Sequence, residues 1–98
     1  SIVVSDVSFI SITKIAPIIY KEFEDLEFWI SLIKPQFEAD KSDIPRGGII
    51  KDDILRENIL NNAIKKIEEI GFKEVGRTIS PIKGAKGNVE YLAHFVRK

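Results

Sequence analysis

The chain has 98 residues and 15 basic against 15 acidic side chains, so its formal net charge is zero and no global basic field marks it as a nucleic-acid binder. It has no cysteine and one histidine, which excludes a disulfide framework and a thiolate or imidazole-rich metal site, so we predict no metal. The lack of cysteine fits a reducing cytoplasm, where we expect the protein. Hydrophobic residues at 44% and charged residues at 31% predict a globular domain, and no apolar run approaches the ~20 residues that span a bilayer.

The start of the chain has an unusual composition. Ser1 directly precedes the apolar run 2–4, and no methionine occurs anywhere in the sequence. We therefore expect residues 1–98 to form a single domain that is a fragment of a larger fold.

The first half of the chain predicts a strand, a helix and a second strand. The β-branched run 2–4 is typical of a central parallel strand covered on both faces. Apolar residues then recur at three- and four-residue spacing over 12–23, which predicts a helix capped by Ser11 or Thr13. Because Pro17 lies inside that pattern, we expect the helix to start late, near Lys14.

The next segment predicts a buried strand, a loop and a long helix. Residues 28–33 form the strand, and Pro35 prevents its simple continuation. The charged and glycine-containing stretch 38–50 predicts a loop. Asp52 or Asp53 can cap the helix that follows, and Gly71 suits its left-handed end.

Two further strands are expected at the C-terminal end. The segment 73–80 alternates in polarity, as an exposed edge strand does, whereas 89–96 is apolar on both faces and needs an interior position. The connection between them favours an antiparallel pair. With right-handed crossovers, the sequence predicts an α/β fold with four strands in the order 1-2-4-3, the last strand antiparallel, and two main helices.

Ionisable residues lie at the ends of three of these strands. Asp6 follows the first strand, Lys34 follows the second and Glu90 opens the last. Charged groups placed against apolar strands usually pair or take part in chemistry, so an acid, a base and an acid are expected to meet at one edge of the sheet.

Four ordered motifs resemble those of the hemolysin A (TlyA) family, whose members carry an FtsJ-like methyltransferase domain. They span nearly the whole chain: Asp-Val-Ser-Phe-Ile-Ser at 6–11, Lys-Pro-Gln-Phe-Glu at 34–38, Gly-Gly-Ile-Ile-Lys-Asp at 47–52, and Ser-Pro-Ile-Lys-Gly with Gly-Asn-Val-Glu-Tyr-Leu over 80–92. The resemblance implies the C-terminal half of a partial Rossmann-like methyltransferase sheet.

The resemblance also implies a function: methyl transfer from S-adenosyl-L-methionine to a ribose 2′-hydroxyl of ribosomal RNA. Asp6, Lys34 and Glu90 match three members of the family's Lys-Asp-Lys-Glu catalytic set, and Asp6 also matches a cofactor-binding position. The first lysine and the glycine-rich cofactor turn have no counterpart in this sequence. The isolated chain is therefore expected to be inactive and to bind the cofactor weakly or not at all.

Two interpretations of Lys34 remain open at this stage. A lysine between two carboxylates can act on the ribose hydroxyl, either by holding its oxygen or by accepting its proton. The same arrangement can be a structural ion pair that ties strand ends together.

Four basic residues are candidates for RNA phosphate contacts: Lys41, Arg46, Lys83 and Lys86. Acidic residues alternate with Lys41 and Arg46, so an ordinary solvated loop is the alternative there, whereas no acid separates Lys83 from Lys86.

Two other classes of protein remain as alternatives. The chain can be a non-catalytic RNA-binding or self-associating module, which would form a homodimer through the exposed edge of the first strand, residues 2–5. The family name also raises a membrane-active hemolysin, but the helices have acidic polar faces, which argues against an interfacial lytic segment and against a membrane partner.

Overall fold

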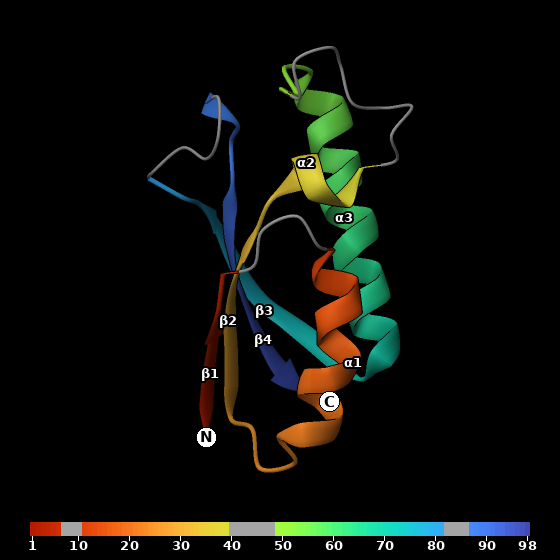
Figure 1. Ribbon diagram of the computed structural model, residues 1–98, viewed down its shortest axis with the longest axis vertical. Coiled ribbons are helices and arrows are strands. Elements are labelled where there is room, and N and C mark those ends of the chain that lie inside the picture. The colour runs from red at the N-terminus through yellow and green to blue at the C-terminus, as the bar shows by residue number, and fades with distance from the viewer. Residues whose placement is uncertain (7–10, 40–48, 82–86) are drawn as a thin grey trace.

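A four-stranded sheet lies against a layer of helices in the computed structural model, which describes residues 1–6, 11–39, 49–81 and 87–98 (Figure 1). The elements in chain order are β1 (Ile2–Ser5), α1 (Ile12–Glu22), β2 (Phe28–Ile33), α2 (Pro35–Glu38), α3 (Asp53–Ile70), β3 (Phe72–Ile79) and β4 (Tyr91–Arg97).

The predicted α/β fold and strand order are confirmed. The sheet has the order β1-β2-β4-β3; β1 and β2 are parallel, and β4 runs antiparallel to both of its neighbours. This arrangement brings the carboxyl ends of β1 and β2 and the start of β4 to the same edge of the sheet. The charged residues predicted at these strand ends can therefore lie close together.

One face of the sheet forms the hydrophobic core with α1 and α3. Trp29, Phe72 and Phe95 have no exposed surface and pack ring against ring, with centroids 5.1 Å apart for Trp29 and Phe72 and 5.0 Å for Trp29 and Phe95. Ala16 from α1 and Leu60 from α3, both fully buried, belong to the same cluster. Alternation along β2 places every second side chain in this core.

Helix α1 begins earlier than its proline suggested. Ser11 is the N-cap, as predicted, but the helix starts at Ile12, so Pro17 lies inside it. The reason is a tertiary contact: the Ile12 backbone N–H donates to Glu38 Oε1 over 2.7 Å. This contact fixes the first turn, although Pro17 removes one hydrogen bond further along.

Helix α2 was not predicted, because Pro35 was expected only to end the strand and the loop was assigned to 38–50. Proline at the first helical position is favourable, since its fixed φ suits the helix and its missing N–H has no partner there anyway. The described part of the chain thus has a third, one-turn helix beside the two main ones, and it follows Lys34 directly.

The ends of α3 follow the predicted signals. Asp52 Oδ1 accepts hydrogen bonds from the N–H groups of Ile54 and Leu55, which makes Asp52 the cap. Gly71 ends the helix at φ 136°, and a β-carbon there would lie 2.4 Å from the Tyr20 ring. Only glycine fits this backbone conformation and this close approach.

The expectation that β1 is covered on both faces is wrong for this chain. Among the described strands β1 pairs with β2 alone, so it is an edge strand, and Ile2 and Val4 are 61% and 74% exposed. The described helices cover only the opposite face of the sheet (Figure 1). The β-branched run 2–4 has the composition of a strand that is covered on both faces, but the described residues cover only one face of it.

Candidate functional site

The predicted pairing of Asp6 and Lys34 is present at the edge of the sheet. Lys34 Nζ lies 2.7 Å from Asp6 Oδ1, with the lysine side chain 12% and the aspartate side chain 58% exposed. The parallel register aligns Ser5 with Ser31, so Asp6 leaves β1 close to where β2 ends. The amine is thus held near the surface by a carboxylate that still faces water.

Glu90 lies on the other side of Lys34 by register. The β2–β4 ladder ends with Ile33 opposite Tyr91, so the next residues on the two strands are Lys34 and Glu90. Glu90 is 6% exposed, and its Oε2 accepts a hydrogen bond of 3.0 Å from Gln36 Nε2. A buried carboxylate therefore stands at the same edge as the ion pair, held by an amide from α2.

The three predicted site residues consequently converge at one end of the sheet. Asp6 and Lys34 are in direct contact, and the register sets Glu90 opposite Lys34. Their catalytic and cofactor-binding roles stay predictions, because the geometry describes the arrangement and not the reaction.

Two site residues were missed in the sequence, although both lie inside motifs quoted for the family resemblance. Gln36 follows Lys34 by two residues, and Asn88 precedes Glu90 by two. Asn88 is 3% exposed, and its Oδ1 accepts a 3.0 Å hydrogen bond from the Ile50 N–H, which fastens the segment before α3 to the entry of β4. In the sequence, only their two-residue spacing from Lys34 and Glu90 could have indicated that they belong to the site.

A buried polar network holds β1 beside β2 just before the ion pair. Ser5 Oγ donates to Ser31 Oγ over 2.7 Å and accepts from Trp29 Nε1 over 2.9 Å. Ser31 is 1% exposed. Because the network joins the last residue of β1 to the middle of β2, it fixes the place where Asp6 emerges.

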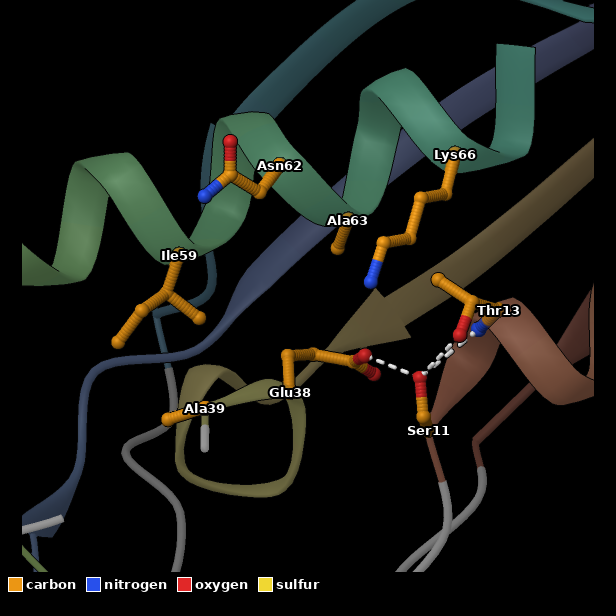
Figure 2. Close-up of a pocket in the computed structure, with 8 residues that line it drawn as sticks. All are labelled: Ser11, Thr13, Glu38, Ala39, Ile59, Asn62, Ala63 and Lys66. Atoms are coloured by element: carbon orange, nitrogen blue, oxygen red, sulfur yellow. Dashed lines mark hydrogen bonds between the residues drawn. The ribbon is translucent and has the colours of Figure 1, made fainter. Parts of the chain in front are cut away.

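A polar pocket of about 110 Å³ lies on the helix side of the same edge, between α1, α2 and α3 (Figure 2). In it the Glu38 carboxylate accepts hydrogen bonds from the Ser11 hydroxyl and the Ile12 N–H. Burial raises the pKa of Glu38 above its usual 4.5, against the opposing effects of these two hydrogen bonds and of the Lys66 charge. Glu38 thus joins the turn that follows Lys34 to the segment that follows Asp6.

Glu38 makes the stability of the fold depend on pH. Its raised pKa means that the folded state binds the proton more tightly than the unfolded chain, so the stability contributed by protonated Glu38 is lost as pH rises from 4.5 through the folded pKa. We expect Glu38→Gln to gain stability relative to the wild type over that window, as measured by urea unfolding at several pH values. A difference independent of pH would contradict this.

Glu38→Ala provides the matched comparison. It leaves the N–H of Ile12, a residue 1% exposed, without its acceptor, which should lower the free energy of unfolding by roughly 1–3 kcal/mol. Asp25→Ala, at an exposed carboxylate near the N-terminus, should change it much less.

The four predicted RNA-contacting residues, Lys41, Arg46, Lys83 and Lys86, lie outside the described residues. Within the described ranges, no three histidine, cysteine or acidic side chains gather as a metal site, and no helix is long and apolar enough to cross a membrane.

Comparison with known proteins finds similar sequences among methyltransferases and hemolysin A/TlyA proteins. A model of the FtsJ-like methyltransferase family matches residues 1–97. Over 96 residues the chain is 76% identical to hemolysin A of Brachyspira hyodysenteriae, covering 98% of this chain and 40% of that protein. Over 92 residues it is 36% identical to the 16S/23S rRNA (cytidine-2′-O)-methyltransferase TlyA of Mycobacterium tuberculosis, covering 93% of this chain and 34% of that protein.

Solved structures agree with the sequence comparison. A structure named "Putative hemolysin" from Streptococcus thermophilus superposes with a TM-score of 0.92 at 36% identity, covering 100% of this chain and 35% of that one. The chain therefore spans less than half the length of each of these relatives. Because the family match extends over nearly all of its residues, the chain belongs to the FtsJ-like methyltransferase family.

Proposed function

We propose that this chain is the C-terminal part of an enzyme that transfers a methyl group from S-adenosyl-L-methionine to a ribose 2′-hydroxyl of ribosomal RNA. The observation that carries the proposal is the Lys34–Asp6 ion pair at the edge where Glu90 also stands. The name of the Mycobacterium tuberculosis relative, a 16S/23S rRNA (cytidine-2′-O)-methyltransferase, supports this substrate class.

The chemistry explains why an amine between carboxylates is useful. A ribose hydroxyl is a poor nucleophile at neutral pH, while the methyl group on a sulfonium is already activated, so the protein mainly has to align the hydroxyl and ease the loss of its proton. Lys34 Nζ can donate to the hydroxyl oxygen and stabilise negative charge that develops on it. Asp6 and Glu90 orient the amine, and a carboxylate can receive the proton.

The residues of this chain fit only part of a site for the cofactor. The carboxylate of Asp6 is 58% exposed at a strand end and can accept hydrogen bonds from amine or hydroxyl groups. The segment between β1 and α1 contains no glycine, so it offers no glycine-rich turn of the kind that lets backbone approach a nucleotide. We infer that the chain alone binds S-adenosyl-L-methionine weakly or not at all and has no activity; micromolar affinity in titration calorimetry would contradict this.

The partner and the location follow from the proposed substrate. Ribosomal RNA is the proposed partner, and a cytoplasmic enzyme meets it directly. Lys41, Arg46, Lys83 and Lys86 are the proposed phosphate contacts, through local charge rather than net charge. A membrane-active hemolysin is less well supported, since acidic and basic side chains are mixed on α1 and α3 and no basic polar face forms.

The test uses a chimera in which this chain replaces the matching 96 residues of hemolysin A from Brachyspira hyodysenteriae. Incubated with methyl-labelled S-adenosyl-L-methionine and ribosomal RNA, the chimera should label the RNA, with hemolysin A itself measured in parallel. If hemolysin A labels RNA and the chimera only binds it, the chain is a non-catalytic RNA-binding module. If neither labels RNA, the proposed reaction is wrong.

We also propose that the isolated chain forms a homodimer through β1. This strand has one described neighbour, and its exposed apolar residues Ile2 and Val4 extend the uncovered face of the sheet. Val4→Lys should shift sedimentation velocity toward the monomer, because it places charge at the proposed contact. Lys73→Glu, on the opposite edge strand, is the control; a monomeric wild type would refute the dimer.

A further inference from the structure

Gln36 is held inside the site by a single hydrogen bond. It lies in the first turn of α2, two residues after Lys34, and is 7% exposed. Its Nε2 donates to Glu90 Oε2 over 3.0 Å, although the two residues are 54 positions apart in the sequence. The amide therefore connects the segment that carries the amine to the buried carboxylate of the strand entry.

The other end of the same amide has no hydrogen-bond partner among the described residues. Gln36 Oε1 is buried and makes no hydrogen bond within the described part of the chain. A buried acceptor without a donor is unfavourable and uncommon in folded proteins. A residue that only had to fill space here could be apolar, so the free oxygen needs an explanation of its own.

The choice of an amide at this position is also specific. A carboxylate in place of Gln36 would face Glu90 as a like charge, and the two groups would have to share a proton. An aliphatic side chain would leave the buried Glu90 without its donor. Glutamine gives one donor to Glu90 and keeps one acceptor for another group.

We propose that Gln36 is a positioning residue: its amide N–H fixes the orientation of Glu90, and its free Oε1 accepts a hydrogen bond from a ribose hydroxyl of the bound RNA. This inference rests on the proposed function. A ribose hydroxyl is a suitable partner, since its O–H can donate to Gln36 Oε1 while its oxygen accepts from Lys34 Nζ. Binding of the nucleotide would then give a donor to an oxygen that has none among residues 1–6, 11–39, 49–81 and 87–98.

The first test measures methyl transfer by the hemolysin A chimera with Gln36→Leu and Gln36→Glu. Gln36→Leu should lower kcat by roughly 10- to 100-fold, the value of a hydrogen bond to a charged group, with an unchanged KM for S-adenosyl-L-methionine. Gln36→Glu should be equally poor at neutral pH but regain activity as pH falls, because one of two adjacent carboxylates then takes up a proton. Asn58→Leu, at an exposed amide on α3 that lines no described pocket, is the control and should keep wild-type kcat.

A pH profile distinguishes positioning from packing. If Gln36 only filled space, Gln36→Leu would keep wild-type kcat or both variants would lose activity equally at every pH, and either result would overturn the proposal. Failure of the proposed function would give a different result: the unsubstituted chimera and hemolysin A would both transfer no methyl group.

A second test needs no activity. Gln36 is the only glutamine in the chain, so its side-chain NH₂ signals in a nitrogen-15 NMR spectrum are readily identified. They should shift in Glu90→Gln, which replaces the carboxylate that accepts from Gln36 Nε2 with an amide. Cytidine should shift them more than 2′-deoxycytidine does. Signals insensitive to Glu90 would overturn the positioning role, and equal responses to the two nucleosides, or none, would overturn the hydroxyl contact.

Discussion

Replacing Lys34 with alanine in the hemolysin A chimera should lower kcat by about 10²- to 10⁴-fold, the range attributed to a positioned acid or base. The amine is the one cation that contacts Asp6 within the described residues, and the register sets it opposite Glu90. Without it, nothing in the described site donates to the oxygen that must lose its proton. Methyl incorporation into ribosomal RNA is the measurement.

Two further variants separate catalysis from structural support. Lys34→Met keeps the aliphatic stem and removes only the charge, so it should lose as much activity as Lys34→Ala. Lys65→Ala removes an exposed lysine from α3 and should leave kcat unchanged. If Lys34→Met lowered the melting temperature while methyl incorporation stayed at the wild-type rate, the ion pair would be structural and Lys34 would leave the mechanism.

Replacing Trp29 with alanine should lower the free energy of unfolding by about 3–5 kcal/mol, because the indole has no exposed surface and packs against Phe72 and Phe95. The substitution also removes the donor to Ser5 Oγ in the network beneath the site. A domain of this size is commonly stable by only about 5–15 kcal/mol, so this one side chain accounts for a large fraction of its stability. Urea unfolding followed by circular dichroism measures it.

Phe28→Ala is the matched control for Trp29. The two aromatic residues are neighbours on β2, but Phe28 points to the uncovered face, is 38% exposed and contacts His94 with ring centroids 5.0 Å apart. Its loss should cost clearly less than the loss of Trp29. Equal costs would show that the uncovered face is buried in solution, and the two-layer description would then be wrong.

The sequence predicted the parts of the fold that depend on local patterns. Period-two and three-to-four-residue spacing located the strands and main helices, Asp52 and Gly71 marked the ends of α3, and the apolar character of 89–96 gave the interior position of β4. The same strand ends predicted the contact of Asp6 with Lys34, since parallel strands deliver their carboxyl ends to one edge of a sheet.

The parts that were missed depend on contacts between distant segments. The start of α1 is set by Glu38, which lies 26 residues beyond Ile12, so the local effect of Pro17 gave the wrong boundary. The bond between Gln36 and Glu90 is equally invisible in the sequence, because nothing local distinguishes that amide from a surface residue. The strand order placed β1 at an edge, but its exposed face was missed, because the apolar composition of 2–4 does not show whether another segment covers that face.

The position of the transferred methyl group tests the central claim most directly. After reaction of the chimera with ribosomal RNA, the RNA is digested to nucleosides and analysed by mass spectrometry. A site built around Lys34 for a ribose hydroxyl predicts a 2′-O-methylated nucleoside that disappears in Lys34→Ala. Methylation on a base, or a 2′-O-methyl product that persists without Lys34, would contradict it.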